Sequence, residues 1–309
     1  MGGTRATTTR EFGTGPRENH DSAPFYARFT SPEVSDDETV NPPLVVDSLF
    51  CQDARHMNQV ADCSVALVVT SPPYFAGKQY ETAMGIGGVP ASYGEYLTLL
   101  EEVLGECKRV LEPGGRIAVN VANLGRRPYR SLSGDVTTIL QDRLGLLLRG
   151  EIIWVKADGA GNSTAWGSYG SAANPVLRDL TERIVIASKG RFDRAPSRAV
   201  RRREGLPHED TISADEFRSL TLDVWRLQPE SARRIGHPAP FPVELPRRLI
   251  ELFTYRADLV LDPFIGSGTT AVAASRSGRR YVGYDTDAGY IELARTRLAS
   301  DRAGVTAGR

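Results

Sequence analysis

The chain has 309 residues, enough for one large α/β domain or two smaller domains. Its hydrophobic fraction of 40% and charged fraction of 25% are ordinary for a globular protein, and its formal net charge of zero argues against a strongly basic nucleic-acid-binding coat. The sequence contains no run of about 18 apolar residues, so it predicts no membrane-spanning helix. The N-terminus also lacks the apolar core of a secretion signal. We therefore expect a cytoplasmic protein.

Cysteine and histidine are too few and too scattered to suggest a metal site. No two of the three cysteines have the spacing of a zinc site, and none follows a proline in a loop, as a nucleophilic cysteine would. The basic residues are almost all arginines, a residue type that suits bidentate contacts with phosphate and guanine. A GC-rich genome would produce the same bias, so composition alone does not identify a ligand.

The first half of the chain alternates between strand and helix patterns after a polar start. Residues 1–43 are rich in Thr, Pro, Gly and acidic residues, which predicts a disordered arm before a folded domain at 44–309. Ser92 and Glu95 have the spacing of a capping box and begin the clearest helix, at 92–111. Strands are expected at 45–52, 65–70, 116–121, 152–155 and 183–187, the last two as an antiparallel pair at the sheet edge.

The second half begins with a break in this rhythm at residues 190–222, which read as an insertion. A short strand near Trp225 and a helix at about 243–255 follow it. The last unit is a strand at 259–261, a glycine loop, a helix from Thr269, a strand at 280–284 and a final helix from Asp287. Strands that alternate with helices predict a doubly wound, mostly parallel α/β sheet with antiparallel edge strands.

The glycine loop at 262–270 (DPFIGSGTT) predicts a cofactor site. Its glycines allow the backbone to approach a ligand closely, and the following helix, which Thr269 or Thr270 can cap, offers unpaired N–H groups to an anion. Asp285 ends the next strand, where an acid accepts hydrogen bonds from ribose hydroxyls. An adenosine-containing cofactor is therefore expected. The loop also satisfies the dinucleotide pattern GxGxxA, so an NAD site and a glycine turn made only for packing remain alternatives.

A second loop at 70–74 (TSPPY) follows a strand that is apolar throughout. Ligands of doubly wound sheets bind at this edge, and a Pro-Pro turn fixes the direction of its carbonyl groups. The amine of an aromatic base is a poor nucleophile because its lone pair is delocalised into the ring. The Ser71 hydroxyl and the Pro72 carbonyl could accept both amine hydrogens and free that lone pair, while Tyr74 stacks on the base. A proline turn that merely ends a strand is the alternative.

Together the two loops resemble the DNA amino-methyltransferases of the permuted beta class, in which an SPPY motif precedes the glycine loop. The resemblance covers about residues 44–298. It implies the S-adenosylmethionine-dependent methyltransferase fold, with a chain that starts at the usual third strand and finishes with the first and second. It assigns Ser71, Pro72, Pro73 and Tyr74 to catalysis. The residues that it assigns to S-adenosylmethionine are Asp53, Thr70, His237, Phe241, Pro242, Asp262, Phe264, Gly266, Ser267, Gly268, Thr269, Thr270 and Asp285. Asp53 follows Gln52, where the family usually has glycine.

The resemblance implies direct transfer of a methyl group to an amino nitrogen of a base flipped out of double-stranded DNA, in a bacterial or archaeal cell. SPPY is typical of cytosine-N4 enzymes and DPPY of adenine-N6 enzymes, so Ser71 favours cytosine, as do the patterns around Trp154 and Trp166. Adenine-N6 methylation is the nearest alternative. Methylation of RNA or a small metabolite, a catalytically inactive DNA-binding module and an NAD-dependent oxidoreductase are more distant ones. A cognate restriction endonuclease is a possible partner, and an orphan enzyme is the other reading.

Sequence readout is expected from the insertion at 190–222, whose arginines would meet phosphates and groove edges; a solvated, flexible loop is the alternative. The loop at 75–88 is expected to close over the base. The predicted DNA contacts are Lys78, Arg191, Arg194, Arg198, Arg201, Arg202 and Arg203.

Overall fold

The computed structural model describes residues 34–73, 92–124, 129–156, 167–230 and 241–307. Side chains are described as far as residue 303. Residues from Ser35 to Arg309 form one unit. Several predicted features lie outside the described residues: the first 33 residues of the arm, the loop at 75–88, and the residues Tyr74, Lys78, Trp166 and His237. No helix in the described part of the chain is both long and apolar enough to cross a membrane.

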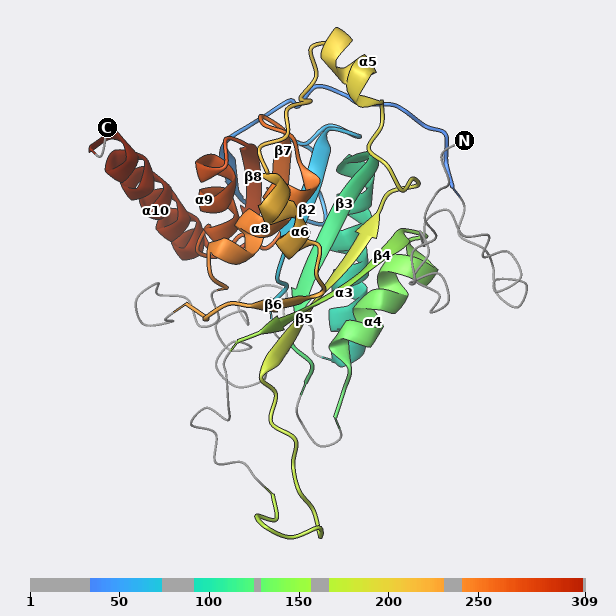
Figure 1. Cartoon of the computed structure of the whole chain (residues 1–309). Coiled ribbons are helices and arrows are strands. Elements are labelled where there is room, and N and C mark those ends of the chain that lie inside the picture. The colour runs from blue at the N-terminus through green and yellow to red at the C-terminus, as the bar shows by residue number, and fades with distance from the viewer. Residues whose placement is uncertain (1–33, 74–91, 125–128, 157–166, 231–240, 308–309) are drawn as a thin grey trace, which may run out of the picture. The chain divides into compact units, whose positions relative to one another are not determined.

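An eight-stranded sheet forms the centre of the unit, in the order β1-β8-β7-β2-β3-β5-β4-β6 (Figure 1). Strands β1, β8, β7, β2 and β3 are parallel neighbours, β5 is antiparallel to both β3 and β4, and β6 is parallel to β4. The strands are β1 (Ser48–Cys51), β2 (Val65–Thr70), β3 (Leu111–Val121), β4 (Leu147–Val155), β5 (Thr181–Ser188), β6 (Val224–Arg226), β7 (Leu259–Asp262) and β8 (Arg280–Asp285).

This order confirms the predicted α/β fold and its permutation. The first strand of the chain, β1, lies at one end of the sheet beside β8, and β7 lies between β8 and β2. The strand that leads to the glycine loop thus lies beside the strand that leads to the SPPY motif, although these strands are far apart in the sequence. The pair β4–β5 is antiparallel, as predicted, but β6 covers β4 and is itself the edge strand.

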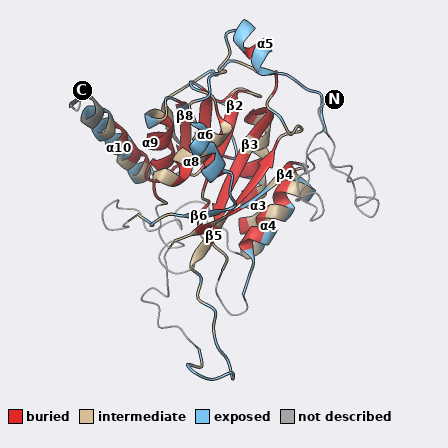
Figure 2. Ribbon diagram, viewed as in Figure 1, coloured by how far each residue is buried: buried red, intermediate tan, exposed pale blue. Residues whose placement is uncertain are grey.

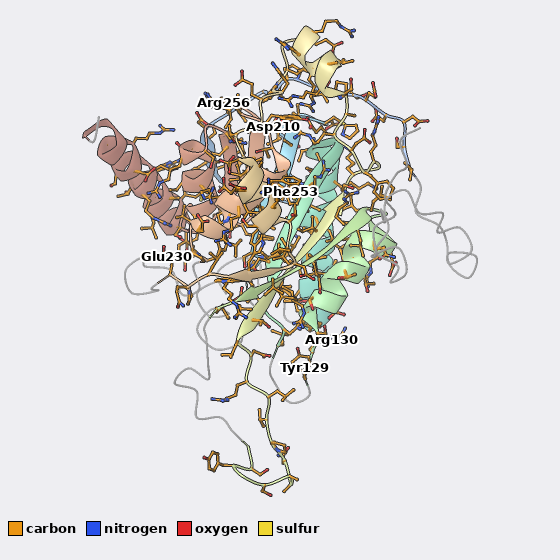
Figure 3. All side chains as sticks on the ribbon, viewed as in Figure 1. Tyr129, Arg130, Asp210, Glu230, Phe253 and Arg256 are labelled. Carbon is orange, nitrogen blue, oxygen red and sulfur yellow. The ribbon has the colours of Figure 1, made fainter. Side chains whose placement is uncertain are left out.

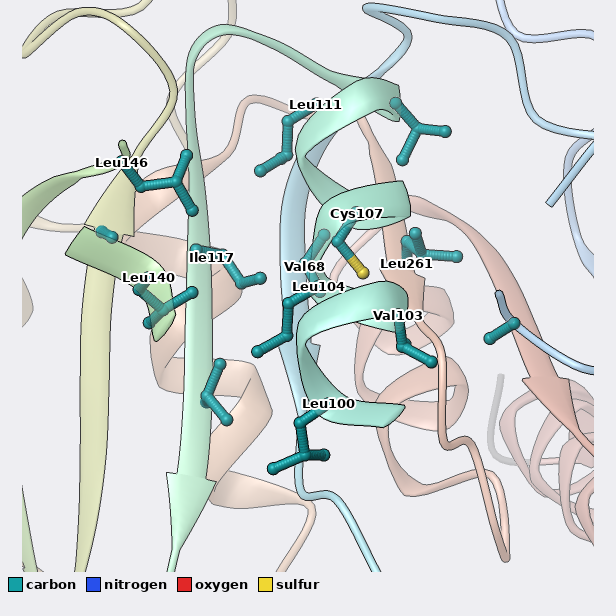
Figure 4. Packing of buried hydrophobic residues seen from close by; sticks show 14 of the residues in the cluster. Val68, Leu100, Val103, Leu104, Cys107, Leu111, Ile117, Leu140, Leu146 and Leu261 are labelled. Atoms are coloured by element: carbon teal, nitrogen blue, oxygen red, sulfur yellow. The ribbon is translucent and has the colours of Figure 1, made fainter. Parts of the chain in front are cut away.

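Helices cover both faces of the sheet and exclude water from it (Figure 2). On one face, α3 (Tyr93–Val110), α4 (Leu132–Thr138) and the π-helical turn η3 (Ile139–Arg143) bury their apolar side chains in a first core. Leu100, Leu104 and Cys107 of α3 pack there against the sheet (Figure 4). On the other face, α6 (Ala214–Leu220), α8 (Glu244–Phe253), α9 (Thr269–Arg276) and α10 (Ala288–Ala307) cover a second core.

Helix α3 begins as its sequence predicts, because the Ser92 hydroxyl accepts a hydrogen bond from the Glu95 amide. Helix α4 and the turn η3 were not predicted. Their apolar residues Leu132, Val136, Ile139 and Leu140 do recur at helical spacing and are buried. The insertion at 190–222 contains the short helix α5 (Arg198–Arg203) as well as α6.

The predicted boundary of the arm at residue 43 is wrong by several residues. The Ser35 amide donates to the Gly190 carbonyl at 2.6 Å, and the Asn41 amide donates to the Cys63 carbonyl at 2.9 Å. The Asn41 side chain adds a bond to the Asp62 carbonyl. Residues 35–43 have no regular secondary structure, but backbone hydrogen bonds attach them to the domain. The prediction of disorder, which was based on polar composition, is therefore wrong for this irregular but attached segment.

Candidate active site at the carboxyl edge of the sheet

Both predicted loops leave the sheet at the same edge. Parallel strands β2, β7, β8 and β1 all end there, at Thr70, Asp262, Asp285 and Cys51. The order β1-β8-β7-β2 arranges the strand ends in one row, with Asp53 two residues beyond β1. Ligands of doubly wound sheets bind at this edge, so the fold brings the predicted cofactor loop next to the predicted catalytic loop.

Asp262 joins the two loops directly. Its Oδ1 accepts a hydrogen bond from the Thr70 hydroxyl at 2.8 Å, and its Oδ2 accepts one from the Thr270 hydroxyl at 2.6 Å. Burial raises the pKa of the Asp262 carboxyl to about 6, although these bonds and one from the Phe264 amide oppose the rise. Asp262, Thr70 and Thr270 are at most 1% exposed. These three side chains hold the two loops together, and their assignment to the cofactor stays a prediction.

Asp285 supports the glycine loop from the next strand. Its Oδ2 accepts a hydrogen bond from the Gly266 amide at 3.0 Å, and its Oδ1 accepts one from the Asp287 amide at 2.9 Å. Burial raises the pKa of the Asp285 carboxyl. The carboxylate therefore shapes the loop, and its remaining lone pairs lie at the edge where ribose hydroxyls would need acceptors.

Arg297 of α10 holds the other side of the glycine loop. Its guanidinium donates to the Ser267 carbonyl and hydroxyl at 2.7 and 2.8 Å, and to the Thr269 hydroxyl at 3.2 Å. Ser267 and Thr269 are each 4% exposed, and Arg297 of α10 engages both hydroxyls; their assignment to the cofactor stays a prediction. Sequence reasoning missed Arg297 because nothing about an arginine in the final helix indicates what it contacts.

The catalytic loop continues β2 as Ser71, Pro72 and Pro73. Ser71 is half-buried and Pro72 is buried. The Tyr96 hydroxyl of α3 donates a hydrogen bond to the Pro73 carbonyl at 2.9 Å, and Tyr96 itself is 2% exposed. Tyr96 thus anchors the Pro-Pro backbone to the first core. The sequence analysis placed Tyr96 only in the apolar stripe of its helix, since the pattern cannot show where a hydroxyl points.

The other predicted cofactor residues surround this edge. Asp53 forms an ion pair with Arg55 at 2.6 Å, and hydrogen bonds from Arg55 lower the pKa of the Asp53 carboxyl. The Asp53 side chain remains 38% exposed. Phe264 is half-buried, and Phe241 and Pro242 come directly before α8. Two carboxylates at neighbouring strand ends and the N-terminus of α9 suit the hydroxyl, amine and carboxylate groups of an adenosine-containing amino acid.

The predicted DNA contacts at Arg194 and Arg201 are wrong. Both side chains bind the buried Glu112, Arg201 at 2.6 Å, and Arg194 also binds Asp258 at 3.0 Å. Arg194 is 8% exposed and Arg201 is 1% exposed, so neither can reach a phosphate. They form a buried ion cluster that fastens the insertion to the domain, an arrangement that requires each charge to be paired.

The remaining arginines of the run lie at the amino ends of the parallel strands, opposite the edge that carries Ser71. Glu112 is at the amino end of β3 and Asp258 directly precedes β7, so the cluster and α5 lie opposite the edge that carries Ser71. Figure 3 shows the separation: Asp210 and Arg256 lie in the upper part of the view, whereas Tyr129 and Arg130, which follow β3, lie below the sheet. Arg191 pairs with Glu38, Arg198 with Asp210 and Arg203 with Glu204.

A different connection extends beyond the Ser71 edge. Strands β4 and β5 are joined there by residues 156–180, of which 167–180 are described and extend far from the sheet (Figure 1). Tyr169 is 82% exposed and Leu177 is 94% exposed. The sequence analysis used this connection only for the pattern around Trp166, because its composition lacks a run of basic residues.

Comparison with known proteins agrees with this geometry. The model of the N6 and N4 DNA methylase family matches residues 65–296, about three quarters of the chain. The type II methyltransferase M.MthZI of Methanothermobacter thermautotrophicus is 30% identical over 276 residues, which cover 81% of this chain and 76% of the relative. The type II methyltransferase M.HpaI of Haemophilus parainfluenzae is 28% identical over 261 residues, covering 83% of this chain and 75% of that relative.

Solved structures extend the likeness to three dimensions. A putative DNA modification methylase of Thermus thermophilus, TTHA0409, complexed with S-adenosyl-L-methionine, has a TM-score of 0.62 at 29% identity, covering 82% of this chain and 93% of its own. The cytosine-N4-specific PvuII DNA methyltransferase has a TM-score of 0.62 at 18% identity, covering 85% and 90%, and shows the shared fold. With the family match, the strand order and the two joined loops in agreement, the chain belongs to the DNA methylase family.

Proposed function

We propose that the protein methylates the N4 amino group of a cytosine flipped out of double-stranded DNA, with S-adenosylmethionine as methyl donor. The observation that carries the proposal is the hydrogen bond from Thr70 to Asp262, which joins the SPPY loop to the cofactor loop. Ser71, one residue further along, therefore lies close to the glycine loop, where the cofactor of this family binds. Effective catalysis of a two-substrate transfer depends mainly on such positioning.

The bound cofactor supplies a methyl group on a positively charged sulfur. In this proposal the chain binds and orients the two reactants: Asp285 and Asp53 accept hydrogen bonds from the adenosine part, and the N-terminus of α9 offers amides to the carboxylate. The Ser71 hydroxyl oxygen and the Pro72 carbonyl accept the two hydrogens of the target amine, which localises its lone pair. The amine releases its proton after it has attacked, so a strong general base is not required.

Ser71 supports cytosine as the target, because a serine at this position of the family motif is typical of cytosine-N4 enzymes. Adenine-N6 methylation is the alternative and requires only a different base in the same pocket. The type II methyltransferases among the relatives support a role beside a restriction endonuclease, with an orphan enzyme as the other outcome.

The test is to express the protein in a host that lacks DNA methylation and to sequence the host DNA by a method that distinguishes modified bases. We expect N4-methylcytosine at one short motif, and far fewer marks from Ser71→Ala, which should methylate slowly. Marks on adenine would overturn the choice of base but keep the reaction. An unmarked genome from folded, cofactor-binding wild-type protein would refute DNA methylation.

A further inference from the structure

Three polar side chains at the Ser71 edge take no part in the function described so far. Asn120 of β3 donates through its amide nitrogen to Glu182 Oε2 of β5 at 2.6 Å. Lys156, directly after β4, donates to the other oxygen, Glu182 Oε1, at 2.9 Å. Asn120 is 3% exposed and Glu182 is 6% exposed, whereas the Lys156 side chain is 29% exposed. Three strands thus contribute to one hydrogen-bonded row, which ends in a partly exposed ammonium group.

The row begins directly beside Ser71. Thr70 of β2 is in register with Val119 of β3, so the next residues along, Ser71 and Asn120, are neighbours across the two strands. Side chains alternate between the faces of a strand, so Ser71 shares a face with Val69 and Asn120 shares a face with Ala118. Val69 and Ala118 belong to the same core cluster, under α8. Ser71, Asn120, Glu182 and Lys156 therefore line one face of the carboxyl edge.

Asn120 has a side-chain acceptor that no described residue satisfies. Its Oδ1 is buried and has no partner among the described residues. The bond to the Glu182 carboxylate identifies the other terminal atom as the nitrogen, so the unpaired atom is an acceptor. Buried acceptors without a partner are rare because they have lost their water and gained nothing in return. Among the described residues this acceptor, next to the proposed catalytic serine, is therefore available to a group that moves or arrives when the substrate binds.

The chemistry of the row matches one edge of the target base. A serine oxygen is a better acceptor for an amine when its own hydrogen is donated elsewhere, and Asn120 Oδ1 is the acceptor on the neighbouring strand. Lys156 Nζ has three hydrogens, of which Glu182 takes one. In cytosine and in adenine alike, the exocyclic amine is bonded to a carbon that also carries a ring nitrogen acceptor. A base with its amine at Ser71 would lie along the row and turn that nitrogen towards the Lys156 end.

We propose that Asn120, Glu182 and Lys156 form the floor of the pocket for the target base. Lys156 Nζ donates to the ring nitrogen beside the amine, Asn120 Oδ1 receives the Ser71 hydroxyl hydrogen, and Glu182 holds both side chains in place. This inference rests on the proposed function, since it assigns the recognition of the same base. The three residues give the pocket a donor and an acceptor in fixed positions. Thymine would be rejected because it has a carbonyl in place of the amine and an N–H in place of the ring nitrogen acceptor.

The test uses duplexes that carry the motif found by genome sequencing, with the target cytosine replaced by 3-deazacytosine, which lacks the ring nitrogen; 1-deazaadenine replaces the target if adenine is marked. Affinity is measured with S-adenosylhomocysteine bound. We expect wild-type protein to bind the natural duplex about 10- to 100-fold more tightly than the deaza duplex, and Lys156→Met to bind both about equally. The comparison is made within each variant, so a general loss of stability cancels.

Arg183→Met is the matched control. Arg183 is next to Glu182 on β5 but on the opposite face, where it pairs with Glu151 at 3.9 Å. It should keep the wild-type discrimination. Undiminished discrimination in Lys156→Met would overturn the role of Lys156, whereas a wild-type protein that marks no DNA would refute the proposed function itself.

Asn120 is tested by a double-mutant cycle with Ser71 in single-turnover methylation. Asn120→Ala should slow the wild-type reaction about tenfold with unchanged affinity for the cofactor, and should slow Ser71→Ala no further, because the hydroxyl that it serves is gone. Additive losses would show that Asn120 acts only on the fold, and would overturn its assignment.

Discussion

The Tyr96 hydroxyl reaches the Pro73 carbonyl from inside the first core. Tyr96→Phe removes this hydrogen bond and keeps the ring that packs there. The net value of a hydrogen bond is about 1 kcal/mol, so a looser Pro-Pro turn should lower kcat about fivefold while leaving the KM for S-adenosylmethionine unchanged. Steady-state kinetics on DNA that carries the recognition motif measure both constants.

Tyr93 provides the control for this substitution from the same helix. Its hydroxyl bonds Asp135 at 2.6 Å, away from the catalytic loop. Tyr93→Phe should keep the wild-type kcat even if it lowers the melting temperature. Equal losses of kcat in both variants would mean that the Pro73 bond has no special role.

Asp262 should impose a pH dependence on stability. Burial raises the pKa of its carboxyl from 3.8 to about 6. The folded protein therefore holds this proton more tightly than the unfolded chain, and ionisation lowers stability as the pH rises from about 4 to about 6. At about 1.4 kcal/mol per pKa unit the loss is on the order of 3 kcal/mol.

Asp262→Asn isolates this effect because an amide does not titrate. Urea unfolding of both proteins between about pH 4.5 and 7.5 should show the wild type losing stability relative to the variant as the pH rises. Other carboxyls affect both proteins alike. A difference in stability that stays constant over this range would contradict the raised pKa.

At the scale of elements, the α9 N-terminus depends on Gly268. This residue has φ of 82°, and a Cβ atom there would lie 2.8 Å from the Ala294 Cβ of α10. Gly268→Ala combines left-handed strain with overpacking, so we expect a loss of about 2–4 kcal/mol in the free energy of unfolding, together with weaker cofactor binding. Chemical denaturation and calorimetry with S-adenosylhomocysteine measure the two effects.

Gly278, just beyond the other end of α9, separates strain from crowding. Its φ is 70°, but the nearest atom to an added Cβ is Arg256 Cγ at 3.7 Å. Gly278→Ala should cost only about 1 kcal/mol, from backbone strain, and leave cofactor affinity unchanged. A Gly268→Ala protein as stable as Gly278→Ala would show that α10 moves aside at no cost.

Most elements were predictable because their patterns are local. The apolar run at 65–70 and the capping residues before α3 carry their own signals, and the strand order follows from the family motif order. Elements without strong local signals were missed or misjudged: α4 was overlooked, and residues 35–43 were assigned to the disordered arm. Residues 35–43 are held by hydrogen bonds to Cys63 and Gly190. These partners are distant in the sequence, so the local pattern does not predict them.

At the scale of the whole molecule, the carboxyl ends and the amino ends of the parallel strands carry different groups of residues. The SPPY and glycine loops share one edge, and the insertion arginines occupy the other. The loops were predictable because each follows its own strand. The arginine cluster was not, because Glu112 and Asp258 lie far from residues 194–201 in the sequence and only the folded sheet brings the charges together.

The exposed arginines of α5 should therefore be dispensable for DNA binding at the active site. We expect the triple variant Arg198→Gln, Arg202→Gln and Arg203→Gln to change affinity for the specific duplex less than threefold at a fixed salt concentration. If these arginines did neutralise phosphates, each contact would make the fall of log affinity with log salt concentration steeper by roughly 0.9. A drop of tenfold or more, with a shallower salt slope, would restore these residues as DNA contacts.

Strand β1 pairs with β8, which is more than 200 residues further along the chain. During synthesis β1 therefore cannot form this pairing until β8 has been made. Strands β2 to β6 can begin to assemble during synthesis, but the cofactor half closes only after residues 280–285 have emerged. Long-range pairing of this kind is slow to form, because the intervening chain must first be brought into place. A chain cut before residue 280 would therefore display its catalytic loop without a closed cofactor site.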